Sequence, residues 1–144
     1  MGYSQIIQDE VANWEGVSHS PHRFGGVEYN LLTPDGRSIE IGHVHGNRLV
    51  DIPFTRKIRE VLVTEGKANP HHVLPDSGWI SFYMQKDSDV EAVLLLFRLS
   101  YLQKLRTGRN RHNPEIEQQI RNLNLSAALQ KVVLGEEYVE ESLE

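Results

Sequence analysis

Two short turns limit how the middle of this chain can fold. Residues 33–36 read Thr-Pro-Asp-Gly, and residues 46–47 read Gly-Asn. Proline presets the backbone of the first turn and glycine accepts positive φ, so the chain reverses tightly at these points. The flanking segments 27–32, 38–45 and 48–52 are predicted strands. Because connections this short join only antiparallel strands, we expect a three-stranded antiparallel meander.

Helical periodicity on both sides of the meander predicts the rest of the fold. Apolar spacing predicts a helix before residue 16, a second over residues 55–65, and a long helix that opens with the capping box Ser-x-x-Glu at 88–91. We expect a loop over residues 20–26 and a fourth strand over residues 79–84. The fold class is α+β. It comprises an antiparallel sheet of about four to five strands packed on one face by helices, in the order α-β-β-β-α-β-α plus a C-terminal helical extension.

Composition narrows the class of protein. The chain has 144 residues and no cysteine, which excludes disulfide scaffolds, thiolate zinc sites and cysteine nucleophiles. We expect residues 1–134, with 15 acidic and 15 basic residues, to form one domain. Residues 135–144 hold the five excess glutamates and are expected to be a disordered acidic tail that ends in a Leu-Glu vector junction.

The sequence also bears on where the protein works. Its longest apolar run, residues 93–97, is too short for a membrane span. Its first residues lack the basic and apolar regions of a signal peptide. We therefore expect a cytoplasmic protein without a membrane partner.

A pair of histidines in the second predicted strand is the first candidate for chemistry. Because side chains alternate along a strand, His43 and His45 are expected to share a face with Ile41, whereas Glu40 and Gly42 face the other way. Two imidazoles so placed can bind a metal with a third ligand, act as general acid and base, or form hydrogen bonds in a core. The candidates for a third ligand are His22, His71, His72, Asp51 and Asp76.

A second histidine pair lies in the loop before the fourth predicted strand. His71 and His72 stand between Pro70 and Pro75. Loops on a rigid scaffold often carry site residues, and imidazoles exchange protons near neutral pH. Equally, the prolines can stiffen the loop while the imidazoles bond to backbone groups.

Aromatic and basic residues near these histidines are candidates for holding a ligand. Trp79 and Tyr83 share a strand face and can floor a groove for a flat molecule, unless Trp79 simply packs beneath the loop. His22 and Arg23 precede the glycine pair 25–26, whose backbone permits close approach of a ligand.

Nucleic-acid binding and phosphate chemistry have little support. Residues 98–112 carry five basic residues and no acidic one, which suits either phosphate contacts or a solvated helix end. Residues 1–134 are balanced in charge, and the sequence has neither a phosphate-binding glycine loop nor a nucleophile elbow. We expect no nucleic-acid partner.

Several segments resemble a bacterial family of unknown function that is labelled a luciferase domain and is distantly similar to fungal luciferase. The resemblance covers about residues 14–103. It rests on Pro21-His22-Arg23-Phe24-Gly25-Gly26, Glu40-Ile41-Gly42-His43-Val44-His45-Gly46, Asp51-Ile52-Pro53-Phe54, His71-His72-Val73-Leu74-Pro75-Asp76-Ser77-Gly78-Trp79 and Leu99-Ser100-Tyr101. The similarity to fungal luciferase itself rests on Glu40-Ile41, His43, His45, His72, Trp79, Tyr83 and Ser100.

This resemblance implies one candidate catalytic site made of His43, His45 and His72. Fungal luciferase oxidises a hydroxylated pyrone with dioxygen, without metal or flavin. By analogy we expect a small-molecule-binding domain that acts as a cofactor-free, metal-free oxidase or oxygenase of a flat hydroxylated aromatic or pyrone, with His43 or His72 as the base. The expected substrate-binding residues are Glu40, Trp79, Tyr83, Arg23 and His22. The alternative is a non-enzymatic ligand-binding or protein-interaction module.

Overall fold

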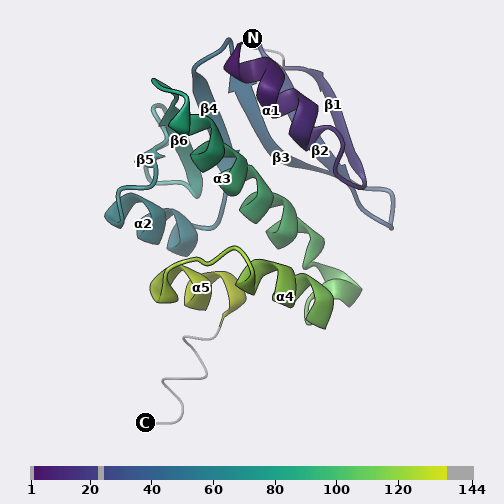
Figure 1. Ribbon diagram of the computed structural model, residues 1–144. Coiled ribbons are helices and arrows are strands. Elements are labelled where there is room, and N and C mark those ends of the chain that lie inside the picture. The colour runs from purple at the N-terminus through teal and green to yellow at the C-terminus, as the bar shows by residue number, and fades with distance from the viewer. Residues whose placement is uncertain (1, 23–24, 136–144) are drawn as a thin grey trace.

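The computed structural model describes residues 2–22 and 25–135 (Figure 1). Within these residues, six strands form one open antiparallel sheet in the spatial order β1-β2-β3-β4-β6-β5. The strands span Val17–Pro21 (β1), Val27–Leu32 (β2), Ser38–His45 (β3), Leu49–Pro53 (β4), Asn69–Pro70 (β5) and Trp79–Tyr83 (β6). The helices span Tyr3–Val11 (α1), Arg56–Thr64 (α2), Ser88–Leu105 (α3), Pro114–Arg121 (α4) and Ala127–Leu134 (α5), with a short 3-10 helix at Gly108–Asn110. The predicted α+β class is confirmed.

Two of these strands, β1 and β5, were not among the strands predicted individually. β1 ends inside the predicted loop over residues 20–26, and β5 has only two residues. β1 pairs with β2 from Val17↔Leu31 to Pro21↔Val27, yet most of its side chains are exposed. It therefore lacks the alternation of buried and exposed residues by which a strand is recognised. Short polar strands of this kind protect the edge of a sheet from pairing with other chains.

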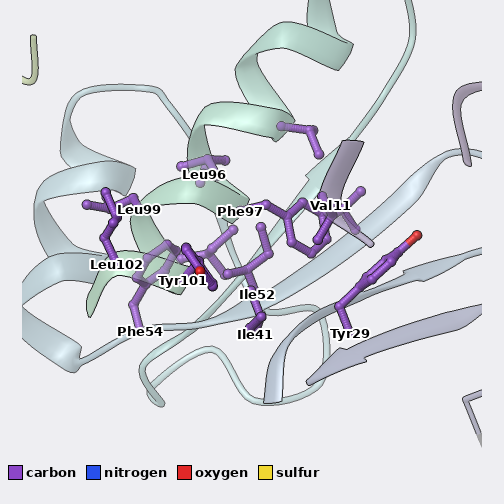
Figure 2. Packing of buried hydrophobic residues seen from close by; sticks show 14 of the residues in the cluster. Val11, Tyr29, Ile41, Ile52, Phe54, Leu96, Phe97, Leu99, Tyr101 and Leu102 are labelled. Carbon is purple, nitrogen blue, oxygen red and sulfur yellow. The ribbon is translucent and has the colours of Figure 1, made fainter. Parts of the chain in front are cut away.

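Helices α1 and α3 lie across the same side of the sheet (Figure 1). The apolar core fills the space between these helices and the sheet (Figure 2). Phe97 of α3 is fully buried, and the centre of its ring lies 5.6 Å from that of Tyr29 on β2. Gly42 of β3 faces this ring, because a Cβ at Gly42 would lie 2.8 Å from a ring carbon of Phe97. The adjacent His43 therefore points to the opposite side of the sheet.

A β-bulge in β3 overturns part of the predicted alternation. The register pairs Tyr29 with Gly42 and Asn30 with Glu40, so Ile41 is an extra residue without a partner on β2. Side chains along a strand alternate between the two faces of the sheet, and an extra residue shifts this alternation by one position. Residues before the bulge therefore face the side opposite to the one that regular alternation predicts. As a result Ile41 is buried in the core, and Glu40 lies on the same face as His43. We predicted the reverse for both residues, whereas the predicted common face of the two strand histidines agrees with the structure.

Some predictions fall on residues outside the described part of the chain. These are Arg23 and residues 136–144, which make up nearly all of the predicted acidic tail. Among the residues that the structure does describe, no helix is both long enough and apolar enough to cross a membrane.

Lys104, in the last turn of α3, has its amine enclosed between this helix and the end of β4. The amine donates hydrogen bonds to the Pro53 carbonyl and, at 2.9 Å, to Ser100 Oγ. Desolvation of the amine lowers the pKa of Lys104 from 10.5 to about 7.

We therefore predict that Lys104 makes the stability of the protein depend on pH. Unfolded Lys104 takes up a proton below pH 10.5 and folded Lys104 only below about 7, so unfolding binds a proton between these values. Stability must then rise with pH across this window, by up to about 1.4 kcal/mol per pH unit. Urea unfolding between pH 7.5 and pH 9.5 should show a smaller rise for Lys104→Met than for wild type or for the exposed control Lys86→Met. Equal slopes in all three proteins would contradict the prediction.

Candidate functional site

The side of the sheet that faces away from α3 brings polar side chains together from three neighbouring strands. The register pairs His43 of β3 with Asp51 of β4, and Asp51 with Ser81 of β6. Paired residues project from the same face, so these three form a row across the sheet. His45 lies two residues further along β3 and shares that face.

The carboxylate of Asp51 is the centre of this site. Its side chain is 1% exposed, and its Oδ1 accepts a hydrogen bond of 2.6 Å from Ser81 Oγ. Its Oδ2 lies near four imidazole Nε2 atoms: 2.9 Å from His45, 3.3 Å from His72, 3.4 Å from His43 and 3.6 Å from His71. Burial acts to raise the pKa of Asp51, but hydrogen bonds from His43, Ser81 and His72 outweigh it and hold the pKa well below its ordinary value.

His43 uses both of its ring nitrogens. Because an ionised carboxylate only accepts hydrogen bonds, Nδ1–H donates to Glu40 Oε2, at 2.6 Å. Nε2 lies 3.0 Å from His45 Nε2 as well as close to Asp51. Burial acts to lower the pKa of His43, but its bonds to Asp51 and Glu40 raise the pKa to about 9. The bulge thus supplies an acid that orients the His43 ring.

The loop between β5 and β6 brings His71 and His72 over the sheet, with different roles. The Nδ1 atom of His71 accepts the backbone N–H groups of Val73 and Leu74, at 3.1 and 3.0 Å. A neutral His71 therefore carries its proton on Nε2, which faces Asp51. Burial lowers the pKa of His71, which favours this neutral form. His72, whose side chain is 37% exposed, is the most accessible of the four imidazoles around Asp51.

Aromatic rings lie against the imidazoles of the site. The His22 ring stacks on the His43 ring, with centres 4.0 Å apart, and Trp79 lies 5.6 Å from His43 and 5.9 Å from His71. Burial and the neighbouring His43 lower the pKa of His22. We call this group the histidine cluster; it consists of His22, His43, His45, His71 and His72 around Asp51.

The structure brings most of the predicted site residues together in or beside the histidine cluster. They are His43, His45, His72, Glu40, His22 and Trp79. Tyr83 stands at the end of β6, pairs in register with Leu49 and is 47% exposed. Arg23 lies outside the described residues, so the structure gives it no position.

Sequence reasoning underrated the importance of Asp51, Ser81 and His71. Asp51 entered only as one of several candidates for a metal ligand, although it is the residue on which the imidazoles converge. One signal was present, because Asp51 is a single acid between the apolar Val50 and Ile52. A buried acid at such a position requires compensating partners.

A hollow of about 750 Å³ lies apart from the cluster, where the turn between β2 and β3 approaches the end of α3. Its lining includes Thr33, Asp35, Arg37, Tyr101 and Lys104, and none of its described lining residues belongs to the histidine cluster. The Arg37 side chain bonds to Asp35 at 2.9 Å, and the Tyr101 hydroxyl bonds to a backbone carbonyl. None of its described lining residues is a histidine, whereas four imidazoles converge on Asp51, so we place the chemistry at the cluster.

Comparison with known proteins gives one family match. Residues 38–100 match the family model of the Luciferase domain. The predicted resemblance is confirmed over these residues, which run from β3 into α3. The luciferase-domain segment contains Glu40, Asp51, Trp79 and four of the five histidines of the cluster, whereas His22 precedes it. A search of curated proteins and a search of solved structures found no match.

Proposed function

We propose that the histidine cluster is the active site of an enzyme that oxidises a flat, hydroxylated small molecule with dioxygen. The observation that carries the proposal is the convergence of four imidazoles on the Asp51 carboxylate, beside the aromatic ring of Trp79. Such concentrations of titratable groups are typical of sites that move protons. The luciferase-domain match supports small-molecule chemistry as an analogy at the level of the family.

His72 is the residue best placed to remove the hydroxyl proton of the substrate. It is the most accessible imidazole of the four, and its Nε2 lies 3.3 Å from Asp51 Oδ2. A proton on Nε2 bonds to Asp51 and leaves Nδ1 to accept the substrate proton. Asp51 then stabilises the imidazolium that forms, as the acid does in a catalytic triad.

The reaction that follows needs no further oxidant. The substrate anion attacks dioxygen, and a bond forms between a ring carbon and oxygen. Two electrons of the substrate thereby reduce dioxygen to the level of a peroxide, and the proton held by His72 returns to give a hydroperoxide. His71 can donate its Nε2–H to the developing oxyanion, and Trp79 offers a flat surface for the ring. His43 and His45 keep the buried carboxylate of Asp51 compensated.

A ligand screen followed by product analysis tests this proposal. Phenols and hydroxypyrones that raise the melting temperature are incubated with the protein in air, and products are analysed by mass spectrometry. We expect a product that is heavier than the substrate by the mass of one dioxygen. His72→Ala should form it at least about 100-fold more slowly than wild type. The control His112→Ala, at an exposed histidine outside the cluster, should be unaffected. Ligands that bind at His72 but are returned unchanged would overturn the enzymatic proposal and indicate a binding module.

A further inference from the structure

We infer that His43, His45 and Asp51 form a binding site for one divalent transition-metal ion. The site lies in the histidine cluster, so its catalytic role rests on the proposed function, although its existence does not. The inference departs from our expectation of a metal-free site and rests on atomic positions around Asp51.

The three donor atoms form a compact triangle. Nε2 of His43 and Nε2 of His45 are 3.0 Å apart, and they lie 3.4 Å and 2.9 Å from Asp51 Oδ2. Ligand bonds to such metals are about 2.0–2.2 Å long, so neighbouring ligands of one ion stand roughly 3.0–3.5 Å apart. All three sides of the triangle are close to this range. The side chains therefore need little rearrangement to bind an ion.

The groups behind the triangle are those that a metal site requires. Glu40 Oε2 accepts Nδ1–H of His43 at 2.6 Å, which leaves Nε2 of a neutral His43 as a lone-pair donor. Ser81 Oγ binds the other oxygen of Asp51 at 2.6 Å and fixes the carboxylate. Metal-binding imidazoles and carboxylates almost always have such hydrogen-bonding partners, which orient them and strengthen binding.

His71 is excluded from the ligand set by its own hydrogen bonds. Its Nδ1 accepts two backbone N–H groups, so a neutral His71 carries a proton on the Nε2 atom that faces Asp51. The donor atoms of His45, Asp51 and His72 also lie within 4.8 Å of one another, which places His72 beside the ion. We assign His72 to proton transfer because of its exposure, and the variants below separate these roles.

The donor set indicates the class of metal. Two imidazoles and one carboxylate are the ligands of mononuclear non-haem iron(II) sites, and similar sets hold zinc. An ion held by three residues keeps positions for oxygen donors, such as a substrate hydroxyl or dioxygen. Bound there, the ion would favour the ionised form of the hydroxyl next to His72.

Metal titration of untagged, chelator-treated protein tests the inference directly. Cobalt(II) is added while visible absorption and heat are recorded, and iron(II) is added under anaerobic conditions. We expect about one ion per chain, with tetrahedral or five-coordinate cobalt(II) absorption. His45→Ala should lose at least about 100-fold in affinity, and Glu40→Gln about 10- to 100-fold, because it weakens the orientation of His43. His72→Ala and the outer control His112→Ala should still bind the ion.

Each other outcome has a defined meaning. Fewer than about 0.1 equivalents of either metal, or unchanged binding in a folded His45→Ala variant, would overturn the inference and leave a hydrogen-bonded network. Circular dichroism of the metal-free variants shows whether they fold. If His45→Ala does not fold, the metal affinity of Glu40→Gln tests the inference instead. An affinity equal to that of wild type would then overturn it. Turnover by metal-free protein would disprove a catalytic role of the ion while upholding the proposed function. Metal binding without turnover of any ligand would uphold the metal site and overturn the proposed function.

Discussion

Replacing Asp51 by asparagine is expected to abolish metal binding and to lower the free energy of unfolding of the metal-free protein by about 3 kcal/mol. Asp51 is buried, and its Oδ2 is the common neighbour of four imidazoles. Asparagine can still accept the bond from Ser81, but it then turns N–H groups toward the imidazoles. Breaking a buried ion pair typically costs about 3–5 kcal/mol. We expect the lower value because histidines can lose their protons instead of remaining charged.

Urea unfolding of chelator-treated protein at neutral pH measures this loss, and cobalt(II) titration of the same samples measures binding. Asp76→Asn is the matched control, because Asp76 is an exposed acid in the loop that carries His71 and His72. It should unfold at the wild-type urea concentration and bind metal normally. A stable Asp51→Asn variant that still binds one cobalt ion would show that the imidazoles do not depend on this carboxylate.

Phe97→Ala is expected to cause the largest loss of stability among single changes in the core, about 3–5 kcal/mol. Its ring is fully buried between α3 and the sheet, beside Tyr29, Ile41 and Ile52 (Figure 2). Truncation removes the ring from the apolar interior and leaves a cavity. The strand residue opposite is Gly42, which has no side chain that could move into the space. We therefore expect a cost toward the upper end of the range.

Thermal and urea unfolding of Phe97→Ala can be compared with those of Leu95→Ala, a change on the same helix at a residue that is 38% exposed. The control should lose less than about 1 kcal/mol. Similar losses for both variants would indicate that α3 packs against the sheet differently from the arrangement described here.

Local sequence signals predicted the parts of the fold that depend on neighbouring residues. The turns at residues 33–36 and 46–47 gave the β2-β3-β4 meander, because short connections allow only antiparallel pairing. The apolar spacing after residue 88 predicted α3. The capping box predicted at 88–91 is not formed, because the helix follows Asp87 and its N-cap has no side-chain hydrogen bond. The common face of His43 and His45 followed from strand alternation, since no bulge separates them.

The centre of the site could not be predicted because it depends on pairing between distant segments. Asp51 meets His43 and Ser81 through the register of three strands, and His22 reaches His43 because β1 pairs with β2. No periodicity encodes a register between β4 and β6, which are joined through a helix and a loop. The position of Glu40 depends on the bulge, which exists only relative to the partner strand.

The bulge gives the site a spacing by which related sequences can be searched. In a regular strand, an acid facing His43 would stand two or four residues before it, but Glu40 stands three residues before it. The expected signature is therefore Glu-x-x-His-x-His, with an aspartate eight residues after the first histidine and a His-His pair in the loop before the next long strand. A relative that lost the extra residue at Ile41 would have a regular strand here, in which the acid stands two residues before the first histidine and still faces it. Its signature would therefore read Glu-x-His-x-His.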